Sequence, residues 1–150
     1  MNARAPADRG PALYTPDILA LAVELAAYPL SDALELRGEA HSRVCGSRVV
    51  IGLTSGPDGA IENAGARVSA CAIGQAAAAL FLRGCLGQDE AEIVAAVGDI
   101  EAWLDGGEAM PTWPDLARIA PARAYPARHA AIVLPWKAAL AALSNPAAAD

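Results

Sequence analysis

The fold class of this chain follows from residues 44–71, which read VCGSRVVIGLTSGPDGAIENAGARVSAC. Residues 48–54 are rich in valine and isoleucine, and residues 60–70 place apolar side chains among polar ones, so both runs predict strands. Between them, residues 55–59 read Ser-Gly-Pro-Asp-Gly, a composition typical of a tight turn. Two strand-like runs joined by a short turn predict an antiparallel hairpin with one buried face.

The residues ahead of this hairpin add a further strand and a helix. Leu34 and Leu36 alternate with charged neighbours, which predicts a small antiparallel sheet of about three strands. Further upstream, residues 15–17 read Thr-Pro-Asp, where threonine can cap a helix, proline suits the first helical position, and aspartate suits the positive end of the helix dipole. Apolar residues then recur at helical spacing up to Pro29, so a helix should precede the sheet.

The pattern after the hairpin is helical. Residues 76–82 predict a helix that ends at Gly84, residues 88–97 predict a second helix, and residues 100–104 predict a short third element. A connection with two prolines follows, and a last helix ends near Leu143. Because the strands are grouped ahead of most helices, the chain is expected to be α+β, with an N-terminal helix, the small sheet, and a C-terminal set of helices packed on it.

The length of 150 residues suits one domain. We expect this domain to span residues 13–144. Residues 1–12 are polar with scattered proline and glycine, which predicts a flexible tail, and residues 145–150 are expected to fray.

Composition argues against several classes of function. The net charge is −6 and the eleven basic residues are dispersed, which argues against a nucleic-acid-binding surface. The longest apolar run, residues 68–82, is shorter than the roughly 18 residues that span a bilayer, so no membrane segment is expected. Three cysteines do not form a paired disulfide framework. These features predict a protein of the reducing cytoplasm.

Two of the three cysteines stand where a thiol could be reactive. Cys45 lies between two strand-like runs and precedes Gly46, whose backbone freedom can expose a thiol at a loop. Cys71 lies where the third run gives way to a helix, and the backbone N–H groups of a helix start favour the thiolate. A thiolate binds soft metals or accepts sulfur. The alternative is that both are buried structural cysteines, since free cysteine often behaves as a small hydrophobic residue.

Several motifs of the chain occur together in one family. Cys45-Gly46-Ser47 stands 26 positions before Cys71, and the turn between them continues as DGAIENA, residues 58–64. Residues 126–128 read PAR and residues 134–138 read LPWKA. With these motifs the chain resembles the IscU/SufU/NifU N-terminal domain family of iron–sulfur cluster assembly scaffolds, and its C-terminal motif is similar to that of the SufU branch. The resemblance spans about residues 13–143.

The resemblance implies a function and a partner. Members of the family receive sulfur from a cysteine desulfurase and build or pass on a [2Fe–2S] cluster, whereas SufU-type members bind zinc and relay sulfur. The chain is thus expected to bind iron or a cluster, or to relay sulfur, through Cys45 and Cys71. Its expected partners are a cysteine desulfurase or other assembly proteins. The chain itself is expected to have at most an accessory part in sulfur transfer, rather than an enzyme activity of its own. Two chains in a homodimer could supply the four thiolates that a cluster needs.

The ligand set that the resemblance implies is incomplete here. The family's aspartate is replaced by Ser47, and its third ligand cysteine falls on Ala131. Zinc is therefore less expected than iron or a cluster, because two of the four family ligands are missing. The same loss favours an alternative function, a metal-free interaction module that keeps the scaffold fold and docks a desulfurase or another assembly factor.

Two histidines are candidate substitute ligands. His41 precedes Cys45 by four residues, and an extended chain would hold the two too far apart to share one ion. His129 precedes Ala131 by two residues and would point to a different face of a regular helix. The alternative for both is a solvated surface histidine.

Two other positions leave a question open. Cys85 is expected about one helix length from Cys71, and the sequence does not assign it a role. Pro135 would break a hydrogen bond to the carbonyl of Ala131 in a helix interior, so the last helix should either begin near Pro135 or bend at Ala131.

Overall fold

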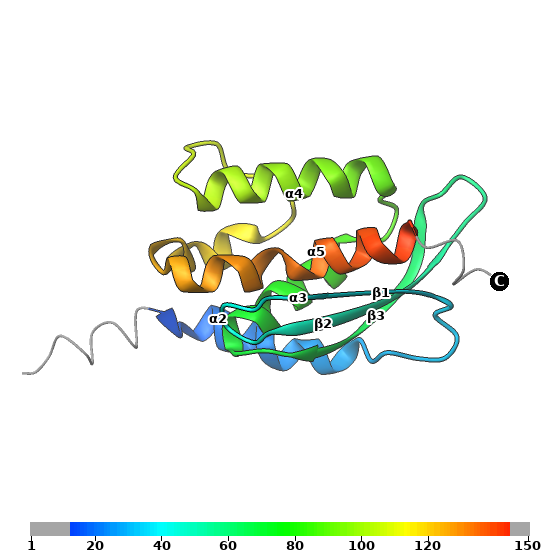
Figure 1. Ribbon diagram of the computed structural model, residues 1–150, viewed down its shortest axis with the longest axis horizontal. Coiled ribbons are helices and arrows are strands. Elements are labelled where there is room, and N and C mark those ends of the chain that lie inside the picture. The colour runs from blue at the N-terminus through cyan, green and yellow to red at the C-terminus, as the bar shows by residue number, and fades with distance from the viewer. Residues whose placement is uncertain (1–12, 145–150) are drawn as a thin grey trace, which may run out of the picture.

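The computed structural model describes residues 13–144, which form a small sheet with helices packed on one face (Figure 1). The three antiparallel strands lie in the order β1-β2-β3 and span Leu36–His41, Arg48–Ser55 and Ile61–Ser69. The α-helices are α2 at Pro16–Glu24, α3 at Ala72–Gly84, α4 at Glu90–Leu104 and α5 at His129–Leu143. The predicted α+β fold is confirmed. The predicted tails, residues 1–12 and 145–150, lie outside the described residues.

The two faces of the sheet differ in character. Val49, Ile51 and Leu53 of β2 are fully buried on one face, which α3 and α5 cover. In Figure 1, α4 lies on the side of α5 away from the sheet. Helix α5 crosses β1 at Gly38, where a Cβ would overlap the backbone oxygen of Ala138. Only glycine therefore allows α5 to lie this close to β1, and this contact sets the height of α5 above the sheet.

Helix α2 begins as the sequence predicts. The Thr15 Oγ1 accepts a hydrogen bond from the Ile18 N–H at 3.2 Å, and Pro16 occupies the first helical position. The helix tightens into a 3₁₀ turn at Leu25–Ala27 before the chain reaches Pro29. Ile18 and Leu21 are fully buried, so the apolar side of α2 packs against α3.

Helix α4 is one continuous helix, so the predicted break between residues 97 and 100 is wrong. Asp89 caps it and forms a reciprocal capping box with Glu92. Ile93, Ile100 and Trp103 are buried along one side at helical spacing, which keeps the helix intact through Gly98. A glycine in an exposed helix interior costs only about 1 kcal/mol. Tertiary packing outweighs that cost.

Helix α5 begins at His129 and contains Pro135 in its interior, so of the two alternatives the one in which the helix begins near Pro135 is wrong. Pro135 has no N–H to donate to the carbonyl of Ala131, a loss that costs about 3 kcal/mol or more in an exposed helix. Here Ile132, Val133 and Trp136 are almost fully buried between the sheet, α3 and α4. Their burial is worth about 1.5–3 kcal/mol each, which offsets the lost bond.

The connection between α4 and α5 has more structure than its prolines suggest. Residues Leu116–Ala124 form 3₁₀ turns, and a further turn spans Pro126–Arg128. Arg123 fastens this segment to the end of α4 by donating to the carbonyls of Trp103 at 3.0 Å and Gly107 at 2.9 Å. Its guanidinium also lies over the Trp103 ring, 4.9 Å from the centroid. The connection therefore delivers the chain to the start of α5 in a defined position.

The described helices are short. Helices α4 and α5 have 15 residues each, and no helix between residues 13 and 144 is long and apolar enough to cross a membrane.

Candidate functional site

Cys45 lies in the tight turn between β1 and β2. The Ser42 N–H donates to the Ser47 carbonyl at 2.9 Å, and the Gly46 N–H donates to the Ser42 carbonyl at 2.9 Å. Gly46 has a φ of 71°, a backbone conformation that glycine adopts at little cost. These backbone features hold the turn in which Val44 has 75% of its surface exposed and Cys45 is half-buried.

Cys71 lies at the same end of the sheet. The strand register pairs His41 with Arg48 and Arg48 with Ser69, so the β1–β2 turn and the end of β3 are neighbours. Cys71 follows two residues after Ser69 and is the N-cap of α3, as predicted. Its side chain makes no capping hydrogen bond and is half-buried. The thiol is therefore available beside the N–H groups of the first turn of α3.

Ala131 completes the group of positions that the resemblance aligns with ligands. It is fully buried in the first turn of α5, and its Cβ lies 3.8 Å from where a Cβ on Gly74 would stand. Gly74 belongs to the first turn of α3, directly after Cys71. The loop, the start of α3 and the start of α5 therefore converge on one end of the molecule, and a methyl group occupies the place of a third ligand.

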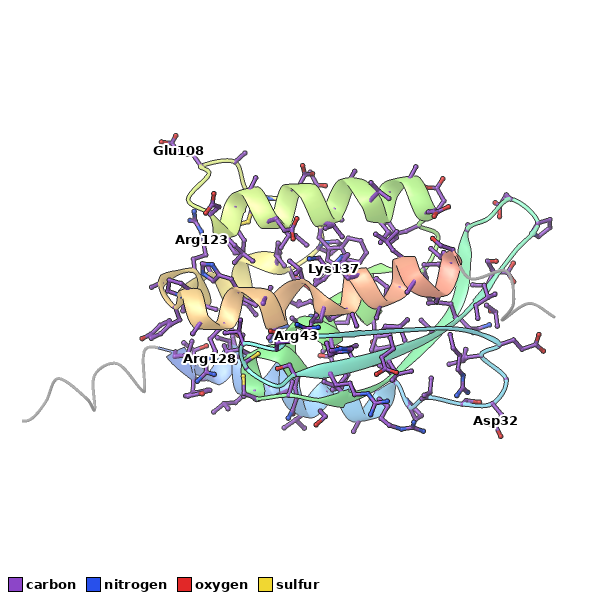
Figure 2. The ribbon with its side chains drawn as sticks, viewed as in Figure 1. Asp32, Arg43, Glu108, Arg123, Arg128 and Lys137 are labelled. Atoms are coloured by element: carbon purple, nitrogen blue, oxygen red, sulfur yellow. The ribbon has the colours of Figure 1, made fainter. Side chains whose placement is uncertain are left out.

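The surroundings of Cys45 favour its thiolate. Partial burial raises the pKa of Cys45, but the hydrogen bond with Ser47, the nearby hydroxyl of Ser42 and the positive charge of Arg128 outweigh it, so the pKa is lowered from its ordinary value. The Cys45 Sγ and Ser47 Oγ lie 3.1 Å apart. Arg128 and Arg43, labelled in Figure 2, come from the segment before α5 and from the turn itself. Cys45 is thus prepared to act as a nucleophile or a soft ligand.

The two serines that flank Cys45 are almost completely buried. Ser42 is 7% exposed and Ser47 is 3% exposed. Ser47 Oγ interacts with the Cys45 sulfur, whereas Ser42 Oγ has no partner within normal hydrogen-bond limits among the described residues. Buried hydroxyls are nearly always paired, so the hydroxyl of Ser42 has a hydrogen free to donate to an anion beside it.

The remaining sequence candidates lie elsewhere. His41 is exposed at the end of β1. The Nε2 of His129 lies 2.9 Å from the Arg123 carbonyl oxygen, and the ring lines a groove of about 480 Å³ between α4 and α5, together with Ala130 and Lys137. Neither Cys45 nor Cys71 lines this groove.

Cys85 belongs to the core. It is fully buried, its thiol donates to the Leu82 carbonyl oxygen at 3.6 Å, and burial raises its pKa to about 12. It therefore stays a thiol at neutral pH and packs as a small apolar side chain.

The residues of one chain do not fit a resident metal ion. Among residues 13–144, no three His, Cys, Asp or Glu side chains are placed to hold one together. Cys45 and Cys71 are two ligands, whereas zinc takes four in structural sites and three in catalytic sites. Ser47 engages its hydroxyl with Cys45, and Ala131 has no donor atom.

Comparison with solved structures identifies the class of protein. An N-terminal NifU-like protein from Brucella abortus, described as nitrogen-fixing, superposes with a TM-score of 0.77 at 28% sequence identity, covering 90% of this chain and 94% of that one. A protein assigned as an iron–sulfur cluster assembly scaffold of the SUF system from Fervidobacterium islandicum superposes with a TM-score of 0.76 at 20% identity, covering 89% and 98%. A hypothetical protein superposes with a TM-score of 0.64 at 17% identity, covering 85% and 97%.

These likenesses span nearly the whole of each chain, whereas no protein-family model and no curated protein matches the sequence. The chain therefore has the fold of the IscU/SufU/NifU N-terminal domain family. The predicted resemblance and the predicted fold are confirmed, and the ligand roles of Cys45 and Cys71 remain predictions.

Two residues next to the thiol were missed from sequence. Ser42 stands three residues before Cys45, and only the hairpin register shows that it turns inward beside Ser47. Arg128 was noticed as part of a motif, and no role was expected for its charge near Cys45. A serine on either side of a cysteine within six residues is a weak signal that could have suggested hydroxyl groups near the sulfur.

Proposed function

We propose that this protein works in iron–sulfur cluster assembly as a sulfur carrier, with Cys45 as the acceptor thiol. The observation that carries the proposal is the setting of Cys45, a half-buried thiol on a loop whose neighbours Ser47, Ser42 and Arg128 favour the anion. The thiolate is the nucleophilic form of cysteine. The fold of its structural relatives supports the same area of metabolism.

The proposed step is a sulfur transfer from a protein persulfide, the product that a cysteine desulfurase carries. The Cys45 thiolate attacks the terminal sulfur of the donor's R–S–SH group. A new S–S bond forms to Cys45 while the donor's S–S bond breaks, and the donor leaves as the thiolate R–S⁻. Cys45 then carries the group S–SH. Atoms and electrons balance without a further oxidant, because the transferred sulfur keeps its oxidation state.

Cys71 has a second part in the proposal. It stands at the same end of the molecule, so it can receive the sulfur from Cys45 or join Cys45 in holding iron or a cluster as cargo. A [2Fe–2S] cluster needs four ligands, which two chains would supply as two pairs of thiolates. A homodimer would then form around the cargo.

One observation favours a second candidate function, a metal-free interaction module. The described residues offer no group of three potential ligands, which is what a module that has lost metal chemistry would present. Val44 is 75% exposed beside Arg43, so the loop could dock a desulfurase or another assembly factor without any reaction of the thiol.

Sulfur transfer from a cysteine desulfurase tests the proposal directly. The protein is incubated anaerobically with the desulfurase and cysteine, then digested and analysed by mass spectrometry. We expect a mass gain of one sulfur atom on the peptide that contains Cys45, lost in Cys45→Ala and retained in Cys85→Ala. Binding of the desulfurase without any sulfur on Cys45 or Cys71 would favour the interaction module and reject the carrier.

A further inference from the structure

The turn that holds Cys45 contains a buried hydroxyl with no partner. Ser42 Oγ is shielded from solvent and forms no hydrogen bond to any described residue. The turn does not need this hydroxyl, because the Ser42 and Gly46 N–H groups already close it through backbone hydrogen bonds. A buried polar group left unpaired destabilises a fold, so an unpaired hydroxyl that the backbone does not need is a sign of a ligand position.

Two further groups face the same sulfur. Ser47 Oγ lies 3.1 Å from the Cys45 Sγ, and the hydroxyl of Ser42 is close enough to the same atom to stabilise its anion. Arg128, just ahead of α5, adds a positive charge from the side of the molecule where α5 begins. Each hydroxyl has one hydrogen to donate, so the pair can make two hydrogen bonds to an anion.

We propose that Ser42, Ser47 and Arg128 form a binding site for the terminal sulfur of a persulfide on Cys45, and that this site takes the place of a metal ion. The inference rests on the proposed function, because it assumes that Cys45 carries sulfur. A persulfide is a stronger acid than a thiol, so its terminal sulfur is negative at neutral pH. Hydrogen bonds to an ionised acceptor are about twice as strong as neutral ones.

The site explains why the lost aspartate is replaced by serine. An aspartate at position 47 would be buried beside the Cys45 sulfur, and two negative groups in contact disfavour each other unless a cation lies between them. Serine presents a hydrogen instead of a charge, so an anionic sulfur can lie there without metal. Ala131 supports this account, because its buried methyl group closes the third ligand position to any donor atom.

The lifetime of the persulfide tests the inference. The protein is loaded with inorganic polysulfide, which needs no docking to a desulfurase, and the remaining Cys45 persulfide is followed over time by alkylation and mass spectrometry. Ser42→Ala and Ser47→Ala should each shorten its lifetime by about tenfold, the loss expected for one charge-assisted hydrogen bond. Ser47→Thr, which keeps a hydroxyl, should largely retain it. Ser55→Ala, an exposed serine at the end of β2, is the matched control and should change nothing.

The outcomes separate this inference from the proposed function. Equal lifetimes in wild type and both alanine variants overturn the hydroxyl site while leaving Cys45 a sulfur carrier. A wild-type protein that loads from polysulfide but not from the desulfurase rejects the proposed function alone. Failure of the wild type to hold sulfur on Cys45 from either donor overturns both. Circular dichroism of each variant shows whether the fold is kept. If Ser42→Ala unfolds, Ser42→Thr and Ser47→Ala still test the hydroxyl site. Ser47→Ala should then shorten the lifetime of the persulfide, whereas Ser42→Thr should not.

Discussion

Restoring the two missing ligands should create a zinc site in this chain. The change is the double substitution Ser47→Asp and Ala131→Cys, which would add a carboxylate and a third thiol to the thiols of Cys45 and Cys71. The new sulfur would stand on the side of α5 that faces the first turn of α3, because Ala131 lies opposite Gly74, a residue without a side chain. The resulting four ligands are the number that tetrahedral zinc requires.

The size of the effect follows from ligand linkage. Zinc that binds only the folded form stabilises it by about 4 kcal/mol when the free metal is at about a thousand times its dissociation constant. For a domain of this size, 1 kcal/mol corresponds to a shift of about 3–4 °C in the melting temperature. We therefore expect zinc to raise the melting temperature of the double variant by about 12–16 °C, and to leave that of the wild type unchanged.

Differential scanning calorimetry with and without zinc measures this shift, and elemental analysis counts the bound metal. The matched control is Ser47→Asp with Ala130→Cys, which adds the same groups but directs the new thiol to the exposed groove between α4 and α5. Two results would refute the conclusion that the Cys45 loop, the start of α3 and the start of α5 meet at one site. One is that the control binds metal as strongly as the double variant. The other is that the double variant folds but remains metal-free.

Three further predictions concern stability, pH and cargo. Gly38→Ala should destabilise the fold by about 3 kcal/mol in urea denaturation, because the new methyl group meets the backbone of α5 at Ala138. Gly46→Ala is the comparison, because its new methyl group meets no atom within 4 Å and its destabilisation reports only the cost of placing alanine at a φ of 71°. Burial holds the pKa of Cys85 at about 12 in the folded state, so above about pH 9 the unfolded chain releases that proton and the folded one does not. The stability of wild type relative to Cys85→Ala should therefore fall by about 1 kcal/mol per pH unit between about pH 9 and 12, and a pH-independent difference would contradict the burial of the thiol. Anaerobic reconstitution with iron and sulfide should give a coloured dimer that needs both Cys45 and Cys71, and a colourless dimer fraction would remove the cluster-bridged form.

The sheet and the first helix were predictable because their determinants are local. The alternation along β2, the turn ahead of Ile61 and the cap at Thr15 each depend on a few neighbouring residues, and the structure has them where the pattern places them. The position of Cys71 as a helix N-cap follows from the same kind of signal, a strand pattern that changes to a helical one.

The errors came from residues whose local preference is overridden by packing. Gly98 and Pro135 both indicate helix ends in isolation, yet α4 and α5 continue through them because buried side chains on either side hold the helices against the core. Local pattern contains no measure of that burial, so it could not weigh a cost of about 1–3 kcal/mol against it.

The candidate site was only partly predictable. Cys45, Cys71 and the lost ligand at Ala131 could be named from motif spacing, and the fold brings these positions to one end. The hydroxyl of Ser42 and the charge of Arg128 reach the same sulfur through hairpin register and through the path of the chain before α5. Both depend on long-range geometry, for which a single sequence carries no direct signal.

Bridging of the two thiols by a dithiol reagent is the most direct test of the whole account. Native protein is treated with one equivalent of phenylarsine oxide and its intact mass is measured. We expect one arsenic per folded chain, bound through Cys45 and Cys71. It should be absent in Cys45→Ala and in Cys71→Ala and retained in Cys85→Ala. A native wild-type protein that takes up no bridged arsenic, or an adduct that survives Cys71→Ala, would contradict it.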